Sequence, residues 1–421
     1  MDTLTAWPRC RSRYLILLFA VALTVRIAFN LSVVGVAPDP NIIDTDGYSK
    51  VAWNLATAGE YAYEVGQPTS YVSPLFPIMM AGVFVIAGFN LLVIRLALSV
   101  IGALTCIVVY SLGREISGEA TGRLAGWLAV FYPFLFFYNA FILSETIFLF
   151  LLSLFTLLVF RIQRVPRQRT IFLAGLILGM CGLTRPVLFP FLALVAVWAL
   201  WFWRDQWRRG LSIALAIVAV SVTVVSPWMA RNYRLWGRFV PGTTVTGIAL
   251  IGGNNLAIFD DPARVGEWIR ARDFLPPKQY EQLMRMSESD RDRWATLEAV
   301  AFMRHHMWDE MPRATLYKLG RFWILPPVVE RTGRLRILWA LFYLPVLGLA
   351  TGGMIATRHL RRDLLMVYLQ FIYFTAVTAV FYGSFRMRAP LEPYLVVFAA
   401  VGLLAYAGPR SPVVRSFVRS L

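Results

Sequence analysis

The segment Leu91–Leu112 reads LLVIRLALSVIGALTCIVVYSL and carries a single charged residue, Arg95. A helix of 22 residues rises about 33 Å, which is enough to cross the roughly 30 Å hydrocarbon core of a bilayer. Similar apolar blocks recur along the 421-residue chain, which is 58% hydrophobic and only 15% charged. Soluble domains carry about 25% charged residues. The sequence therefore predicts an all-α polytopic membrane protein.

Ten membrane-spanning helices are expected, and the short gaps on one side of them are rich in Arg. This excess of basic residues marks the cytoplasmic side. We therefore expect a protein of a bacterial-type inner membrane with both termini on the cytoplasmic side. It also accounts for the net charge of +17 without nucleic-acid binding. The expected spans are Tyr14–Val36, Leu91–Leu112, Leu124–Ile142, Thr146–Phe160, Ile171–Leu183, Val187–Trp203, Leu211–Trp228, Leu335–Ala356, Leu364–Tyr382 and Tyr394–Tyr406.

The polar segments divide the chain into three parts. Residues 1–229 form an N-terminal transmembrane catalytic module with a first loop at 37–90, residues 230–334 a small extracytoplasmic subdomain, and residues 335–421 the C-terminal helices. Within the first loop, Asp46–Ala58 has helical periodicity and is expected to lie on the outer leaflet, ending at Gly59. Leu75–Phe89 is short for a span and is expected to be a partly embedded outer element.

Carboxylates gather on the predicted outer side, where they serve no packing purpose. Asp44 and Asp46 follow the first span, and either is a candidate general base. The alternative is an N-cap for the following helix, for which Asp46 is better placed, so Asp44 is the stronger candidate. Glu145 follows Ser144 between two apolar helices, where a functional acid competes with an acidic first turn behind a Ser144 cap.

Arginines on the same outer side violate the positive-inside pattern and need a local reason. Arg386 and Arg388 suit a phosphate, which a guanidinium can bind in bidentate fashion. Snorkelling to lipid headgroups and pairing with Glu392 are the alternatives. Arg185 and Arg231 could extend the same anionic site, or anchor headgroups.

Motifs for nucleotides and metals are not evident. The chain has no Walker loop or dinucleotide-type glycine pattern. His305 and His306 are adjacent but lack partners at ligand spacing. We expect no cofactor and no resident metal, although a divalent cation stays possible.

These residues resemble the GT-C membrane glycosyltransferases, in the branch of the protein O-mannosyltransferases and lipid A aminoarabinose transferases. The similar stretches are Asp44-Thr45-Asp46-Gly47-Tyr48, Pro68-Thr69-Ser70-Tyr71, Leu143-Ser144-Glu145, Pro227-Trp228 with Arg231-Asn232-Tyr233, and Arg386-Met387-Arg388-Ala389-Pro390-Leu391-Glu392-Pro393. The likeness extends from the first span to the last. It departs in the proline loop, where Val72 and its neighbours are uncharged although some relatives place a Lys or Arg there.

The resemblance implies a GT-C bundle that transfers a hexose or pentose from a polyprenyl-phosphate donor to an acceptor hydroxyl, with inversion, on the outer face of the membrane. It implies Asp44, Asp46 and Glu145 as catalytic residues and Arg386, Arg388, Arg185 and Arg231 as phosphate ligands. Tyr48, Tyr71 and Asn232 are expected to contact substrate. The acceptor is open: a protein, a lipid or a glycan.

Two other functions compete with this one. A transporter or flippase for lipid-linked saccharides would need charges near the bilayer midplane and paired broken helices, which the sequence does not suggest. A lipid-linked polymerase or ligase would also use arginines on the outer side, but would not need the Asp44–Glu145 pair.

Overall fold

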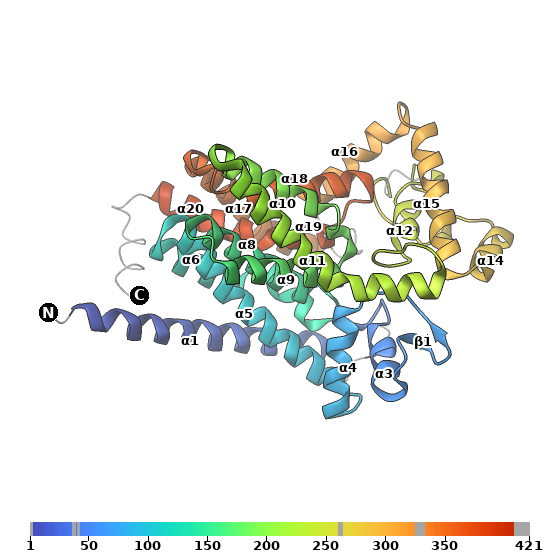
Figure 1. Cartoon of the computed structure of the whole chain (residues 1–421), viewed down its shortest axis with the longest axis horizontal. Helices are drawn as coiled ribbons and strands as arrows, with labels where there is room; N and C mark the ends of the chain where they lie inside the picture. The colour runs from blue at the N-terminus through green and yellow to red at the C-terminus, as the bar shows by residue number, and fades with distance from the viewer. Residues whose placement is uncertain (1–2, 36–38, 40–42, 260–263, 325–332, 408–421) are drawn as a thin grey trace.

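The computed structural model describes residues 3–35, 39, 43–259, 264–324 and 333–407. Long helices form a bundle with a smaller helical part at one end (Figure 1). The start of α1 and the end of α20 lie at the opposite end, consistent with the prediction of two termini on one side. The arginine-rich tail after residue 407, predicted to be cytoplasmic, lies outside the described residues.

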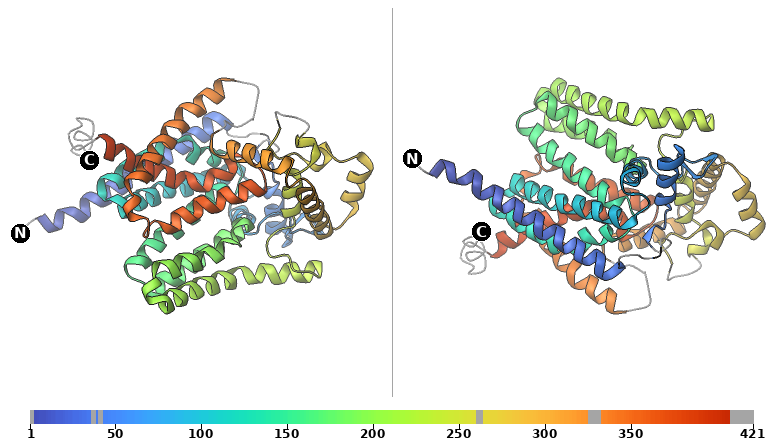
Figure 2. Two further views of the ribbon diagram at one scale, coloured as in Figure 1. Left: turned by 90° about the horizontal axis from the view of Figure 1, so that it is seen from above. Right: turned by 90° about the horizontal axis from the view of Figure 1, so that it is seen from below.

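The bundle contains the helices that the apolar blocks predict. Its main members are α1 (Thr3–Phe29), α5 (Leu91–Ser117), α6 (Glu119–Phe131), α8 (Glu145–Arg164), α9 (Gln168–Thr184), α10 (Phe191–Phe202), α11 (Trp207–Trp236), α17 (Gly333–Ala356), α18 (Leu365–Val380) and α20 (Glu392–Ala407). Figure 2 shows them side by side in two further views. Short elements join them, namely η1 (Asn30–Val34), α7 (Pro133–Phe136), η2 (Phe137–Ala140), η3 (Pro186–Leu188), η4 (Arg204–Gln206), η6 (Arg358–Leu360), α19 (Phe385–Arg388) and η7 (Ala389–Leu391).

Fewer helices than ten have the length and apolarity of a complete span. Among the described residues, five do, and a sixth is added if a bent pair counts as one span. The remaining predicted spans coincide with shorter apolar helices such as α9, α10 and α18. The ten-span topology and its orientation therefore stay predictions.

The bent pair corrects the predicted continuous span Leu124–Ile142. Helix α6 ends at Phe131, and the chain turns by 69° into α7 and η2. Pro133 causes the break, because it lacks an amide proton and keeps the preceding residue out of the helical region. Tyr132 accordingly has an extended backbone, with φ −80° and ψ 112°.

Helix α11 also differs from its prediction, since it continues eight residues past Trp228 to Trp236. The predicted domain boundary at 229/230 therefore falls inside a helix. The added turns carry Arg231 and Asn232, whose side chains bind the loop before Tyr71. Polar contacts thus extend the helix beyond its apolar part.

The first loop contains helix α3 (Tyr48–Ala58), strands β1 (Ala62–Glu64) and β2 (Gln67–Pro68), and helix α4 (Leu75–Ala87). The strands pair antiparallel. Gly59 ends α3 as predicted, with the left-handed φ of 71° that glycine tolerates. The sequence did not predict the short hairpin.

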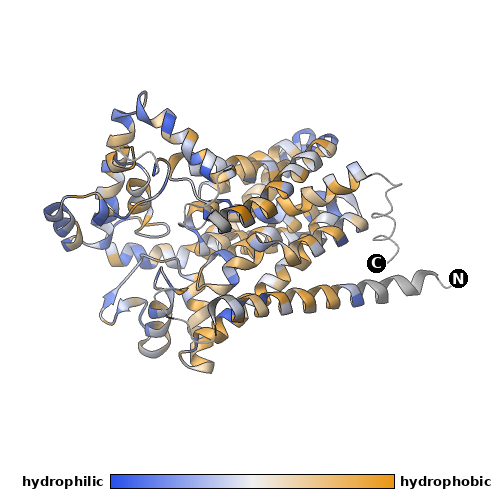
Figure 3. Cartoon of the chain, turned by 180° about the vertical axis from the view of Figure 1, so that it is seen from behind, coloured by the Kyte–Doolittle hydropathy of each residue, from blue (hydrophilic) through white to orange (hydrophobic). Residues whose placement is uncertain are grey.

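The subdomain consists of α12 (Thr246–Gly252), α13 (Leu256–Phe259), η5 (Ala271–Asp273), α14 (Pro277–Arg285), α15 (Glu288–His305) and α16 (Glu310–Trp323). A small core that includes Ile248, Ile251 and Ala295 joins α12 to α15. Hydrophilic residues are more frequent along this part of the chain than along the bundle helices (Figure 3). Glu288 ties it to the first loop by accepting hydrogen bonds from Thr69 Oγ1 at 2.7 Å and the Ser70 amide at 3.0 Å.

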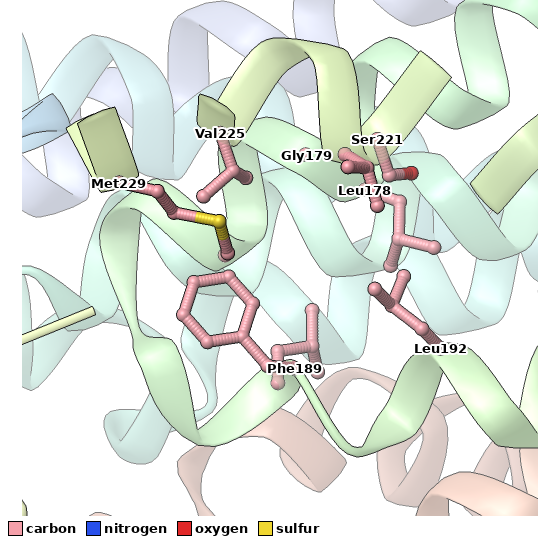
Figure 4. Close-up of a pocket in the computed structure, with 10 residues that line it drawn as sticks. Leu178, Gly179, Phe189, Leu192, Ser221, Val225 and Met229 are labelled. Carbon is pink, nitrogen blue, oxygen red and sulfur yellow. The ribbon is translucent and has the colours of Figure 1, made fainter. Parts of the chain in front are cut away.

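Close packing in the bundle depends on small residues. A Cβ added at Gly175 or Gly179 of α9 would lie 2.7 Å from a valine side chain of α11, so glycine allows these helices to touch. Beside this contact lies an apolar void of about 20 Å³, lined by Leu178, Phe189 and Met229 among others (Figure 4). Its lining offers no charged group, so we assign it to packing.

Candidate functional site

A much larger cavity, of about 480 Å³, lies where the first loop, the bundle and the subdomain meet. The first loop contributes Asp46, Tyr48 and residues 71–73, and the α9–η3 junction contributes residues 184–187. Residues of α12, the end of α18 and Arg386 complete the wall. Several sequence segments that were predicted to be functional therefore meet around one space.

Four charged side chains form a network at this wall. Glu145 is only 1% exposed and accepts from Arg185 Nη2 at 2.5 Å. It also accepts from Arg386 Nε in a close ion pair and from Arg386 Nη2 at 3.4 Å. The Nη2 atom of Arg386 further donates to Asp46 Oδ2 at 2.9 Å. One buried carboxylate thus orients two guanidinium groups, each of which lines the cavity.

Burial separates the roles of the two carboxylates. Glu145 is enclosed by its arginine partners, whereas Asp46 and Arg386 each keep 32% of their side chains exposed. A partly exposed ion pair has little net stability, about 0.2–1 kcal/mol. A ligand can therefore exchange with Asp46 on Arg386 far more easily than with Glu145.

Tyr48 and Ser144 connect this network to helix α3. The Tyr48 hydroxyl donates to Ser144 Oγ at 3.4 Å, and Arg185 Nε donates to the same oxygen at 3.4 Å. Burial raises the pKa of Tyr48 to about 12. Tyr48 is therefore a neutral donor near neutral pH rather than a base.

The structure reverses the predicted capping roles of the two aspartates. Asp44 caps α3, because its carboxylate accepts from the Tyr48 amide at 2.9 Å and the Ser49 amide at 2.7 Å. Asp46 caps nothing and faces Arg386. Burial raises the pKa of Asp44, and the hydrogen bonds from Ser49 and Tyr48 oppose that shift. Asp44 does not line the cavity.

Of the predicted pair of phosphate-binding arginines, only Arg386 reaches the cavity. Arg388 is buried and donates from Nε to Glu392 Oε1 at 2.7 Å and from Nη1 to the Phe322 carbonyl at 2.7 Å. Its guanidinium also lies 3.7 Å from the centre of the Tyr343 ring. This is the pairing with Glu392 that the sequence left as an alternative, and it gives Arg388 a structural role.

Arg231 and Asn232 hold the proline loop instead of lining the cavity. Arg231 donates to Ser70 Oγ at 3.2 Å and lies 4.6 Å from the centre of the Trp228 ring. Asn232 accepts from Ser70 Oγ at 2.8 Å and donates to the Val240 and Gly242 carbonyls. Their contribution to the site is therefore the position of the neighbouring Tyr71, which does line the cavity.

Sequence reasoning missed the contribution of the subdomain. Thr243, Thr246 and Trp268 line the cavity together with Tyr382 at the end of α18. A Trp within a polar segment was the only signal available. As for metals, the described ranges contain no group of three His, Cys, Asp or Glu side chains that could hold an ion.

Comparison with solved structures identifies the architecture. ArnT from Cupriavidus metallidurans, solved with undecaprenyl phosphate, matches 95% of this chain with a TM-score of 0.58 at 17% identity. The Archaeoglobus fulgidus oligosaccharyltransferase AglB, in complex with an inhibitory peptide and a dolichol phosphate, matches 97% with a TM-score of 0.57 at 13% identity. The chain has the GT-C fold of membrane glycosyltransferases.

The other comparisons match only part of the chain or find no match. The family model for dolichyl-phosphate-mannose-protein mannosyltransferase matches residues 71–230, a range from the proline loop into α11. No curated protein matches the sequence. The chain covers 61% of the length of ArnT and 51% of that of AglB.

Proposed function

We propose that this GT-C protein transfers a sugar from a polyprenyl-phosphate donor to an acceptor hydroxyl on the extracytoplasmic side of the membrane. The matched family and ArnT both point to lipid-phosphate-linked sugars. The sugar is a hexose or pentose, and the acceptor is a protein, a lipid or a glycan.

The observation that carries the proposal is the composition of the cavity wall. Arg185 and Arg386 offer two guanidinium groups, which bind phosphate oxygens in bidentate geometry. The apolar residues Val187, Val377 and Phe381 line the same space. An amphiphile with an anionic head and a hydrocarbon tail complements such a wall.

Donor binding and base activation are coupled in this proposal. In the structure Asp46 accepts the hydrogen bond that Nη2 of Arg386 donates. A donor phosphate takes that position, because the partly exposed Asp46–Arg386 pair has little net stability, while Glu145 keeps Arg386 in place through Nε. Asp46 is thereby released next to the bound donor, where its carboxylate oxygen can accept a proton from an acceptor hydroxyl.

The transfer itself is a displacement at the anomeric carbon. Asp46 takes the proton of the acceptor hydroxyl, the acceptor oxygen forms a bond to that carbon, and the carbon–oxygen bond to the phosphate breaks. The electron pair leaves with the phosphate, whose charge Arg386 and Arg185 neutralise. Attack opposite the leaving phosphate inverts the anomeric configuration.

Other residues that the sequence predicted for the site hold the reacting and phosphate-binding groups in place. Glu145 holds both arginines, Asp44 fixes the start of α3, and Tyr48 orients Ser144 and Arg185. We assign no step to a metal ion.

Mass spectrometry of lipids that co-purify with the solubilised protein tests the proposal. We expect polyprenyl phosphate, free or glycosylated, with the wild type and its loss with Arg386→Gln. This variant leaves Glu145 paired with Arg185, so no buried charge is stranded. Equal amounts of polyprenyl phosphate with both proteins would contradict the phosphate role of Arg386, and bulk phospholipid alone would contradict the donor class.

A further inference from the structure

Trp268 is a rigidly held aromatic side chain on the subdomain wall of the cavity. Its segment is pinned by three backbone contacts: the Ile269 amide donates to the Gly252 carbonyl at 2.9 Å, the Gly383 amide to the Gly266 carbonyl at 2.8 Å, and Arg321 Nε to the Val265 carbonyl at 2.7 Å. Gly252 makes room for the indole, since a Cβ there would lie 2.1 Å from its Nε1. The indole edge is thus packed against α12, while Trp268 as a whole residue stays 38% exposed.

Tyr382 extends this aromatic surface toward the charged network. The centres of the Trp268 and Tyr382 rings are 6.4 Å apart. Tyr382 also lines the same cavity as Arg185 and Arg386. The backbone joins the two features as well, because Gly383 is bonded to the Trp268 segment and lies three residues before Arg386.

Trp268 comes from a different part of the chain than the apolar bundle residues of the cavity, and Tyr382, just after α18, lies between the two sets in the fold. Val187 and Val377 come from the η3 and α18 segments of the bundle, whereas Trp268, Thr243 and Thr246 belong to the subdomain. A phosphate at Arg386 would therefore share the cavity with apolar bundle residues that suit a lipid tail and with an aromatic, hydroxyl-bearing set of subdomain residues.

A pyranose or furanose ring fits this aromatic, hydroxyl-bearing set chemically. Its face of C–H groups packs on the flat apolar face of an aromatic ring, and its hydroxyls need polar partners at the edges. Trp268 and Tyr382 supply the rings, and Thr243 and Thr246 supply hydroxyls. In a polyprenyl-phosphate donor the sugar is bonded directly to the phosphate, so it must lie beside the arginines.

We propose that Trp268 and Tyr382 form the subsite for the sugar of the donor, a neutral or weakly charged monosaccharide ring that stacks on the indole. This inference rests on the proposed function and assigns the subdomain a part in sugar selection. It separates recognition of the lipid phosphate, by the arginines, from recognition of the sugar, by Trp268.

The test compares two kinds of lipid on the same purified protein in nanodiscs. Affinities are measured by native mass spectrometry for undecaprenyl phosphate and for its mannosyl, glucosyl and arabinosyl forms. We expect Trp268→Ala to weaken binding of the preferred glycosylated lipid by roughly 3- to 10-fold, as loss of an aromatic contact does, with little change for bare undecaprenyl phosphate. Trp268→Phe should restore most of the difference.

Controls separate this inference from the function it rests on. Arg386→Gln should weaken all four lipids together, and Trp308→Ala, which removes an 89% exposed indole outside the cavity, should change none. If Trp268→Ala weakens bare and glycosylated lipid equally, or neither, the sugar subsite is wrong while the phosphate site stands. If the wild type binds none of the four lipids, the proposed function itself fails.

Discussion

In the proposed reaction a donor phosphate displaces Asp46 from Arg386. We therefore expect Asp46→Asn to bind the lipid phosphate more tightly and to transfer the sugar more slowly than the wild type. The Asp46–Arg386 pair is partly exposed on both sides, so its loss is worth about 0.2–1 kcal/mol. Removing this competitor should tighten binding of bare undecaprenyl phosphate by about 1.4- to 5-fold. Loss of a general base should slow turnover by roughly 10²- to 10⁴-fold.

The matched control is Asp44→Asn, two residues away. Its carboxylate accepts hydrogen bonds from the Tyr48 and Ser49 amides at the start of α3, and loss of such a cap destabilises a protein by about 1 kcal/mol. We expect a lower Tm, lipid affinity within twofold of the wild type, and a far smaller loss of turnover than with Asp46→Asn.

Native mass spectrometry gives the affinities, and the rate of conversion of glycosylated to bare undecaprenyl phosphate, with a cell-envelope extract as acceptor, gives turnover. Weaker binding of the lipid phosphate by Asp46→Asn would contradict the exchange on Arg386, and wild-type turnover in Asp46→Asn with loss of turnover in Asp44→Asn would contradict Asp46 as the base. The second outcome would restore Asp44 as the base.

Two further predictions concern buried charges. Glu392→Gln leaves the buried Arg388 without its carboxylate, at a cost of about 3–5 kcal/mol. Glu145→Gln removes the carboxylate that pairs with Arg185 and Arg386, whose side chains are 18% and 32% exposed, and should lower Tm less. Only Glu145→Gln should change the affinity for undecaprenyl phosphate, and equal effects on that affinity would contradict the separate roles of the two pairs. Burial in the subdomain raises the pKa of Asp292 from its ordinary value of 3.8 to about 6. The folded state therefore binds this proton more tightly than the unfolded state, which stabilises the fold at low pH. The stabilisation is complete below about pH 4 and is lost as pH rises through 6. The Tm of Asp292→Asn minus that of the wild type should therefore increase from pH 4 to pH 7. The wild type loses at most about 3 kcal/mol of folding stability over this change, which is the free energy that corresponds to the raised pKa. A difference in Tm that does not depend on pH would show that the Asp292 carboxyl titrates normally.

The main helices and the centre of the site could be predicted from local sequence signals. Long apolar blocks such as Leu91–Leu112 are sufficient to place a helix, and Glu145 and Arg386 stood out because charge beside an apolar block is costly unless it is paired. The sequence left Arg185 between an extension of the anionic site and a headgroup anchor. The structure brings these three side chains together.

Predictions from the sequence were wrong where a side chain contacts residues that are not its immediate neighbours in the sequence. Asp44 caps a helix that starts four residues later, because the chain turns at Gly47 with a φ of 70°, and the rule of an adjacent cap chose Asp46 instead. The break at Pro133 was visible in the sequence but was outweighed by the apolar residues on both sides. Arg388 and Glu392 have the i,i+4 spacing of a helical ion pair, and this spacing favours their pairing over a phosphate role for Arg388.

The place of Trp268 could not be predicted at all. It reaches the cavity through contacts between segments more than a hundred residues apart, including the hydrogen bond from Gly383 to Gly266. No local pattern encodes such a contact.

The most direct test of the central claim is a transfer reaction with purified protein, glycosylated undecaprenyl phosphate and a cell-envelope extract, followed by mass spectrometry of the lipid. We expect bare undecaprenyl phosphate to accumulate with the wild type while the sugar appears on a component of the extract, and we expect Asp46→Asn and Arg386→Gln both to abolish this conversion. Donor that stays glycosylated with the wild type, or conversion that persists in both variants, would contradict the claim that this cavity catalyses sugar transfer.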